Sequence, residues 1–112
     1  MLLFATASVG RPYVNFSDKV GDEFAYLGYL ALQEQNPERA TRLLERAVWL
    51  EPEHAGYWFN LGIAYQRSDM FDKAMNAYTR AHELAPNQQE YNETMLAFKV
   101  WWEDESQRNT PR

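Results

Sequence analysis

The sequence predicts an all-α fold built from two consecutive helix–turn–helix units. Residues 21–54 and 55–88 align with each other without a gap, at a spacing of 34 residues. Small residues, aromatic residues and a final proline fall at the same places in both units. A fixed period of this length is typical of helical hairpins that stack side by side and bury a continuous core between them.

A glycine stands at the same place in each unit, at Gly28 and Gly62, inside an otherwise helical pattern. Glycine costs about 1 kcal/mol relative to alanine in a helix interior, so its presence at one phase in both units indicates a packing requirement. We interpret it as two helices that cross closely at that point. Each unit ends at a proline, which cannot donate the hydrogen bond that would extend a helix. The other matching pairs include Leu27 and Leu61, Ala40 and Ala74, Arg46 and Arg80, Ala47 and Ala81, Leu50 and Leu84, and Pro52 and Pro86.

The first four helices are predicted from capping and turn residues. Ser17 is a candidate N-cap for the first helix. Asn36 and Pro37 combine an N-cap with a proline at the first helical position, which predicts that a second helix begins there. Turns at residues 51–54 and 68–69 separate the helices that follow. The expected helices run from about residue 18 or 22 to 35, and over about 37–50, 55–67 and 70–84.

A fifth helix is expected to cap the array. Asn87 and Glu90 have the spacing of a capping box, which predicts a helix over residues 88–104. Apolar residues recur in it at helical spacing, as expected of a face that docks on the fourth helix. These residues are Tyr91, Met95, Phe98 and Trp102. A repeat array needs an end piece of this kind to cover its last hydrophobic face.

The two ends of the chain do not fit the repeat. Residues 1–16 are interpreted as an N-terminal arm, because Gly10 and Pro12 interrupt any regular element there. Residues 105–112 are polar and are expected to form a tail. The 112 residues therefore predict a single domain over 17–104, with repeats at 21–54 and 55–88 and the capping helix at 88–104.

Composition and charge exclude several classes of function. The net charge is −5, whereas binding to nucleic acid requires a basic face, so no nucleic-acid partner is expected. The absence of cysteine excludes a disulfide scaffold and a thiolate metal site. No apolar run approaches the roughly 20 residues that span a bilayer, which predicts no membrane insertion. The short apolar start lacks a basic segment, so no signal peptide is predicted and a cytoplasmic location is expected.

The sequence has no spacing of residues that is typical of a catalytic site. The two histidines, His54 and His82, are expected at the surface, one in a turn and one on the outer side of the fourth helix. There is no His-Glu-x-x-His spacing for a metal and no glycine-rich phosphate loop. Without a constellation that meets the requirements of an active site, we predict no enzymatic activity and no cofactor.

The second unit has an aromatic residue, a leucine, a glycine and a second aromatic residue in its first helix, then small residues and a proline. These are Trp58, Leu61, Gly62 and Tyr65, followed by Ala74, Tyr78, Ala81 and Pro86. The pattern resembles the tetratricopeptide repeat family position for position, and the first unit differs from it at Ala31, where an aromatic residue is usual. The resemblance implies a right-handed superhelix of two hairpins, with a concave surface formed by the first helix of each pair.

Carrying the family's concave surface over to this chain gives a set of candidate partner-binding residues. They are Tyr26, Tyr29, Leu32, Gln33, Phe59, Asn60, Ile63, Arg67 and Trp101. Most are aromatic or aliphatic, which favours an apolar or aromatic peptide segment as the ligand. Asn60 offers a donor and an acceptor to a peptide backbone. The family's grip on acidic chaperone tails needs several cations, and these are missing from the matching positions.

The sequence therefore predicts a non-catalytic protein–protein interaction module that acts as an adaptor, assembly factor or small chaperone. The alternative is a self-assembling structural unit, a homo-oligomer whose groove holds the N-terminal arm or the end helix of another copy. A third interpretation is a segment of a longer repeat array.

Overall fold

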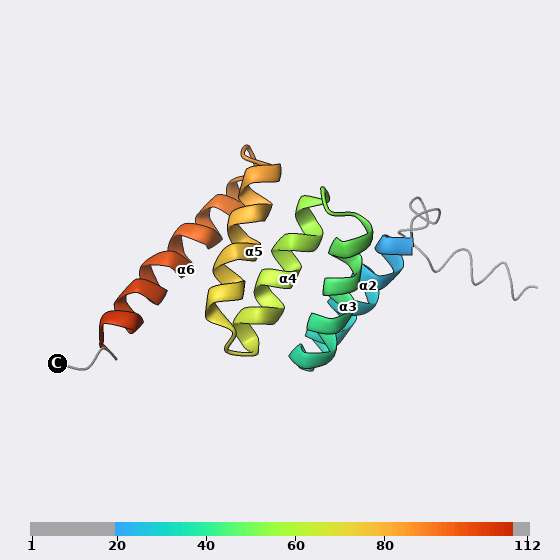
Figure 1. Cartoon of the computed structure of the whole chain (residues 1–112), viewed down its shortest axis with the longest axis horizontal. Coiled ribbons are helices and arrows are strands. Elements are labelled where there is room, and N and C mark those ends of the chain that lie inside the picture. The colour runs from blue at the N-terminus through green and yellow to red at the C-terminus, as the bar shows by residue number, and fades with distance from the viewer. Residues whose placement is uncertain (1–19, 109–112) are drawn as a thin grey trace, which may run out of the picture.

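The computed structural model describes residues 20–108, which form five α-helices and no strand. Consecutive helices lie side by side, from α2 at one end of the molecule to α6 at the other (Figure 1). Their bounds are Val20–Gln33 for α2, Pro37–Leu50 for α3, Ala55–Arg67 for α4, Phe71–Leu84 for α5 and Gln89–Arg108 for α6. The predicted all-α architecture of two hairpins and a closing helix is confirmed. The predicted arm at 1–16 and the Ser17 cap lie outside the described residues.

The turn inside each hairpin has the same form in both repeats. Gln35 and Asp69, which are equivalent residues, both have left-handed backbones with φ of 61° and 60°. The next backbone N–H bonds back to a carbonyl near the end of the first helix, from Asn36 to Ala31 and from Met70 to Tyr65. This is the Schellman pattern, which satisfies the last carbonyls of a helix. The Asn36 side chain then accepts a hydrogen bond from the Arg39 N–H at 3.2 Å and begins α3, as predicted.

The two interior glycines lie where the helices of each hairpin approach most closely. A Cβ at Gly28 would lie 2.6 Å from Cγ of Leu44, and a Cβ at Gly62 would lie 2.6 Å from Cδ1 and Cε1 of Tyr78. Leu44 and Tyr78 are equivalent residues, and both are fully buried. The close helix crossing predicted from the glycines is therefore confirmed in both hairpins.

Two buried tyrosines tie neighbouring helices together through their hydroxyl groups. Tyr65 on α4 donates to Oε2 of Glu45 on α3 at 2.5 Å, and Tyr78 on α5 donates to Oε1 of Gln66 on α4 at 2.6 Å. Burial raises the pKa of Tyr78 to about 12, although the nearby positive charge of Arg67 opposes the shift. Burial and the bond to Glu45 also raise the pKa of Tyr65 well above its usual value. Both hydroxyls are therefore protonated donors at neutral pH.

Leu27 on α2, the first helix described, is more exposed than its repeat equivalent on α4. Leu27 is 42% exposed, whereas the equivalent Leu61 is 1% exposed, because Leu61 packs in the interior of the array while α2 is the first helix described.

At the other end of the array, α6 continues to Arg108, past the end predicted at residue 104. Residues 105–108 thus belong to the helix and not to a polar tail. Ion pairs from Arg108 to Asp104 and Glu105 stabilise this last turn.

Candidate partner-binding groove

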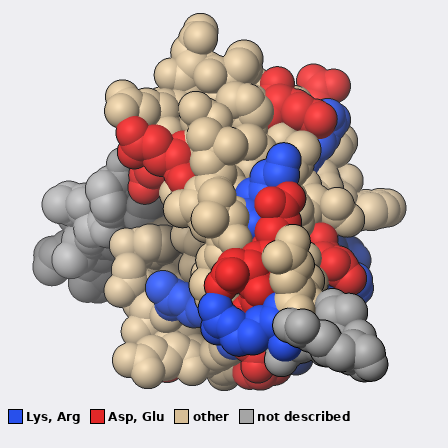
Figure 2. Space-filling view, turned by 90° about the vertical axis from the view of Figure 1, so that its left-hand side faces the viewer, with Lys and Arg blue, Asp and Glu red and all other residues tan. Residues whose placement is uncertain are grey.

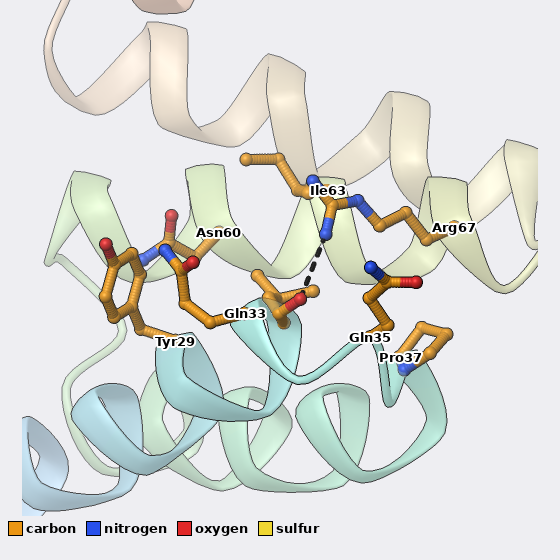
Figure 3. A pocket seen from close by; sticks show the side chains of 8 residues that line it. Tyr29, Gln33, Gln35, Pro37, Asn60, Ile63 and Arg67 are labelled. Carbon is orange, nitrogen blue, oxygen red and sulfur yellow. Dashed lines mark hydrogen bonds between the residues drawn. The ribbon is translucent and has the colours of Figure 1, made fainter.

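A groove of about 610 Å³ lies between α2 and α4, the first helices of the two hairpins. Its lining combines amide, aliphatic and aromatic side chains with one guanidinium group (Figure 3). The lining residues are Tyr29, Leu32, Gln33, Gln35, Pro37, Asn60, Ile63 and Arg67. Six of the nine residues predicted from the sequence are among them, namely Tyr29, Leu32, Gln33, Asn60, Ile63 and Arg67.

The groove has an apolar floor and a polar rim. Leu32 is 7% exposed and Ile63 is half-buried, so these two side chains form the base. Tyr29, Gln33 and Asn60 gather at one end and point toward one another (Figure 3). The rim is more polar than the sequence predicted, because the turn after α2 also contributes the amide of Gln35. A surface of this kind presents hydrogen-bond donors and acceptors around a patch that excludes water.

Arg67 crosses from α4 to α2 at the other end of the groove. Its Nη1 donates to the main-chain oxygen of Leu32 at 3.2 Å (Figure 3). This oxygen lies in the last turn of α2, where it also accepts a hydrogen bond from the Gln35 N–H at 3.0 Å and where the helix dipole places partial negative charge. Arg67 is the one cation among the lining residues, and no carboxylate lines the groove in the described part of the chain.

A smaller hollow of about 270 Å³ continues the concave surface toward the start of α4. Tyr26, another predicted residue, lines this hollow together with Tyr29 and Asn60, which also line the groove. His54 closes one side, where its ring stacks on Tyr57 with 3.7 Å between ring centroids. Seven of the nine predicted residues therefore lie on one continuous surface, six in the groove and Tyr26 beside it.

The structure places the remaining two predicted residues, Phe59 and Trp101, in the packing around α6. The Phe59 ring stacks on Tyr91, with centroids 4.5 Å apart. Trp101 packs against Phe71 at 5.0 Å and against Phe98 at 5.6 Å, and it stays 41% exposed. Phe59 thus packs against α6, and Trp101 packs against α5, so neither side chain lines the groove.

Metal-binding clusters and membrane-spanning helices are absent from the described residues. Within 20–108, no group of three His, Asp or Glu side chains is placed to hold a metal ion. No helix in the same span combines the length and apolar character needed to cross a membrane. His82 differs from its prediction as an ordinary surface residue, because it is half-buried and its Nδ1 atom has no hydrogen-bond partner among the described residues.

Comparison with known proteins agrees with the repeat architecture. Residues 27–98, more than half of the chain, match the tetratricopeptide repeat family. The chain is also similar to the tetratricopeptide repeat-containing protein trd-1 of Caenorhabditis elegans, with 33% identity over 61 residues. That alignment covers 54% of this chain but 8% of the relative, so the chain spans a small part of that protein's length. On the family match and the stacked hairpins together, this chain belongs to the tetratricopeptide repeat family.

Proposed function

We propose that the groove between α2 and α4 binds an extended segment of another protein. Repeats of this family are protein–protein interaction modules. The proposal is supported by the side chains of Gln33 and Asn60, which lie close together above the apolar floor formed by Leu32 and Ile63. Each amide side chain has both a donor and an acceptor, which is what the unpaired backbone of an extended peptide requires. The floor takes apolar or aromatic side chains that the peptide turns toward it.

The charge of the groove narrows the choice of ligand. A tail with several carboxylates needs several cations, and Arg67 is the single cation in the described lining. The net charge of −5 disfavours nucleic acid. We therefore propose a largely uncharged peptide segment and a non-catalytic role as adaptor, assembly factor or small chaperone. The single domain over residues 17–104, the absence of a cofactor and the cytoplasmic location stay predictions.

Asn60→Arg is expected to weaken partner binding at least tenfold, because a long charged side chain then occupies the polar end of the groove. The test compares affinity capture from native extract with the wild type, Asn60→Arg and Asn76→Arg. Asn76 is exposed on α5 and does not line the groove, so it controls for the added charge. A synthetic peptide of the captured segment should bind the wild type and Asn76→Arg alike, and should bind Asn60→Arg at least tenfold more weakly.

Two controls keep this result interpretable. Thermal melting by circular dichroism must show that both variants fold as the wild type does. Capture of the same proteins by all three forms would contradict the groove as the site. Recovery of further copies of this chain alone, lost with Asn60→Arg, would instead support the self-assembling unit.

A further inference from the structure

A third hollow, of about 600 Å³, lies beyond the groove, where α4 and α6 begin and α5 ends. It shares His54 and Gly56 with the smaller hollow, which in turn shares Tyr29 and Asn60 with the groove. The three hollows therefore form one concave surface. We name the third one the end hollow, and its lining includes Glu53, His54, Gly56, Leu84, Pro86 and Tyr91.

One face of α4 connects the groove with the end hollow. Gly56, Asn60 and Arg67 follow one another at spacings of four and seven residues, which places them on the same side of the helix. Gly56 leaves the passage open, because a Cβ there would lie 3.3 Å from the His54 ring and 3.4 Å from the Tyr91 hydroxyl. Gly56 and Arg67 lie about 16 Å apart along the helix axis, a distance that about five extended residues span.

The side chains at the two ends of this surface carry opposite charges. Arg67 lines the groove at one end, whereas Glu53 lines the end hollow and Asp22 lines the smaller hollow. In the described part of the chain, no lysine or arginine lines either hollow. Figure 2 views the molecule from the α6 side and shows two acidic clusters in its upper part, where α6 begins, with a basic side chain beside one of them.

The helix dipoles do not cancel the negative charge around the end hollow. Three helices, α2, α4 and α6, begin at this end, and each start corresponds to about half a positive charge. Lys19, which precedes α2 in the sequence, adds one more. The carboxylates in the first turns of α2 and α6 and in the turn before α4 outnumber these charges. They are Asp22, Glu23, Glu51, Glu53 and Glu90.

We propose that the partner segment extends from the groove into the end hollow and places a lysine or arginine side chain there. This inference rests on the proposed function of the groove. Lysine and arginine combine an apolar stem with a charged end, so the stem packs on Leu84 and Pro86 while the charge lies near Glu53. The Tyr91 ring adds a further favourable contact for a cation. An acidic side chain would instead meet a like charge.

The smaller hollow between the two sites contains a polar group that lacks a partner. Tyr57 lines this hollow and is 4% exposed, and its hydroxyl has no hydrogen-bond partner among the described residues. Buried hydroxyl groups are ordinarily paired, because an unpaired one costs free energy. A backbone group of the segment that crosses the hollow would supply this partner, which supports one ligand that spans all three hollows.

The test selects random 12-residue peptides, displayed on phage, against the full chain as wild type, Glu53→Lys and Glu103→Lys. Glu103 is exposed on α6 and lines neither the groove nor the end hollow, so it controls for the change of charge. Peptides selected on the wild type and on Glu103→Lys should carry a lysine or arginine about five residues from their apolar positions. Peptides selected on Glu53→Lys should carry an aspartate or glutamate there.

A selected peptide then measures the contact itself by calorimetry. Replacing its basic residue by alanine should weaken binding to the wild type at least threefold, and should change nothing with Glu53→Gln. Gly56→Gln places a longer uncharged side chain in the passage and should remove the preference for a basic residue. Circular dichroism must show that each variant folds as the wild type does.

The outcomes separate this inference from the function proposed for the groove. Peptides that are lost with Asn60→Arg but show no basic preference would overturn the inference and leave the groove as a binding site. The same basic preference with Glu53→Lys, or with Gly56→Gln, would also overturn it, because the cation would then bind elsewhere. Selection of no peptide by the wild type would overturn both proposals.

Discussion

Tyr78→Ala is expected to lower the free energy of unfolding by about 3–5 kcal/mol, the range for removing a buried aromatic side chain. The Tyr78 side chain is among the largest that are fully buried, with 1% exposure. Its ring packs against Phe59 and Phe98, with centroids 5.9 Å and 5.4 Å away. Alanine would leave a cavity where α4, α5 and α6 meet. Urea unfolding followed by circular dichroism measures the loss.

Tyr78→Phe is the matched control for this prediction. Phenylalanine keeps the ring contacts and removes only the hydrogen bond to Gln66, which contributes about 1 kcal/mol. If the alanine variant lost no more stability than the phenylalanine variant, packing of the ring could not be what holds the second hairpin to α6. A chain this small has a modest core, so the alanine variant is expected to unfold at markedly lower urea concentration.

Gly62→Ala is expected to lower the free energy of unfolding by about 2 kcal/mol, as overpacking of a core does. Alanine alone would favour the helix by about 1 kcal/mol, so the expected sign comes entirely from the packing. The added methyl would lie 2.6 Å from two atoms of the enclosed Tyr78 ring, and α4 and α5 would have to separate to admit it. Thermal and urea unfolding of the full chain measure the change.

Gly56→Ala serves as the control, because Gly56 is also in α4 but its nearest neighbours are the ends of side chains and not an enclosed ring. Its added methyl would meet the His54 ring at 3.3 Å and the Tyr91 hydroxyl at 3.4 Å, and the exposed His54 side chain has room to move. Here the helix preference dominates, so stability should rise by up to about 1 kcal/mol. Equal effects of the two substitutions would contradict the close crossing of α4 and α5.

Much of the fold could be predicted because the residues that determine helix packing occur at the same places in both repeats. Gly28 and Gly62 predicted the crossings, and Asn36 with Pro37 predicted the start of α3 through local chemistry alone. The groove residues were predicted from the resemblance to the tetratricopeptide repeat family, whose concave positions carry over to Asn60 and its neighbours one turn away. These features depend on contacts within one or two helices, which sequence spacing describes well.

The remaining features depend on contacts between distant helices. Phe59 and Trp101 have the spacing of groove residues, but the rings on α6 and Phe71 on α5 draw them into packing around α6. Gln35 lines the groove because its left-handed turn directs it there, and a non-glycine residue gave no signal of that backbone. The extension of α6 relies on ion pairs of Arg108, whose geometry becomes visible only once the helix is formed.

We propose the concave groove as the site where a partner segment binds. The most direct measurement is nuclear magnetic resonance of the full chain titrated with the peptide identified by capture, observing the side-chain amide signals. If the peptide binds in the groove, the signals of Gln33, Gln35 and Asn60 shift together and saturate with the peptide, while that of Asn76 on α5 stays in place. Shifts confined to Asn76 or to residues of α6, with the three groove amides unmoved, would contradict it.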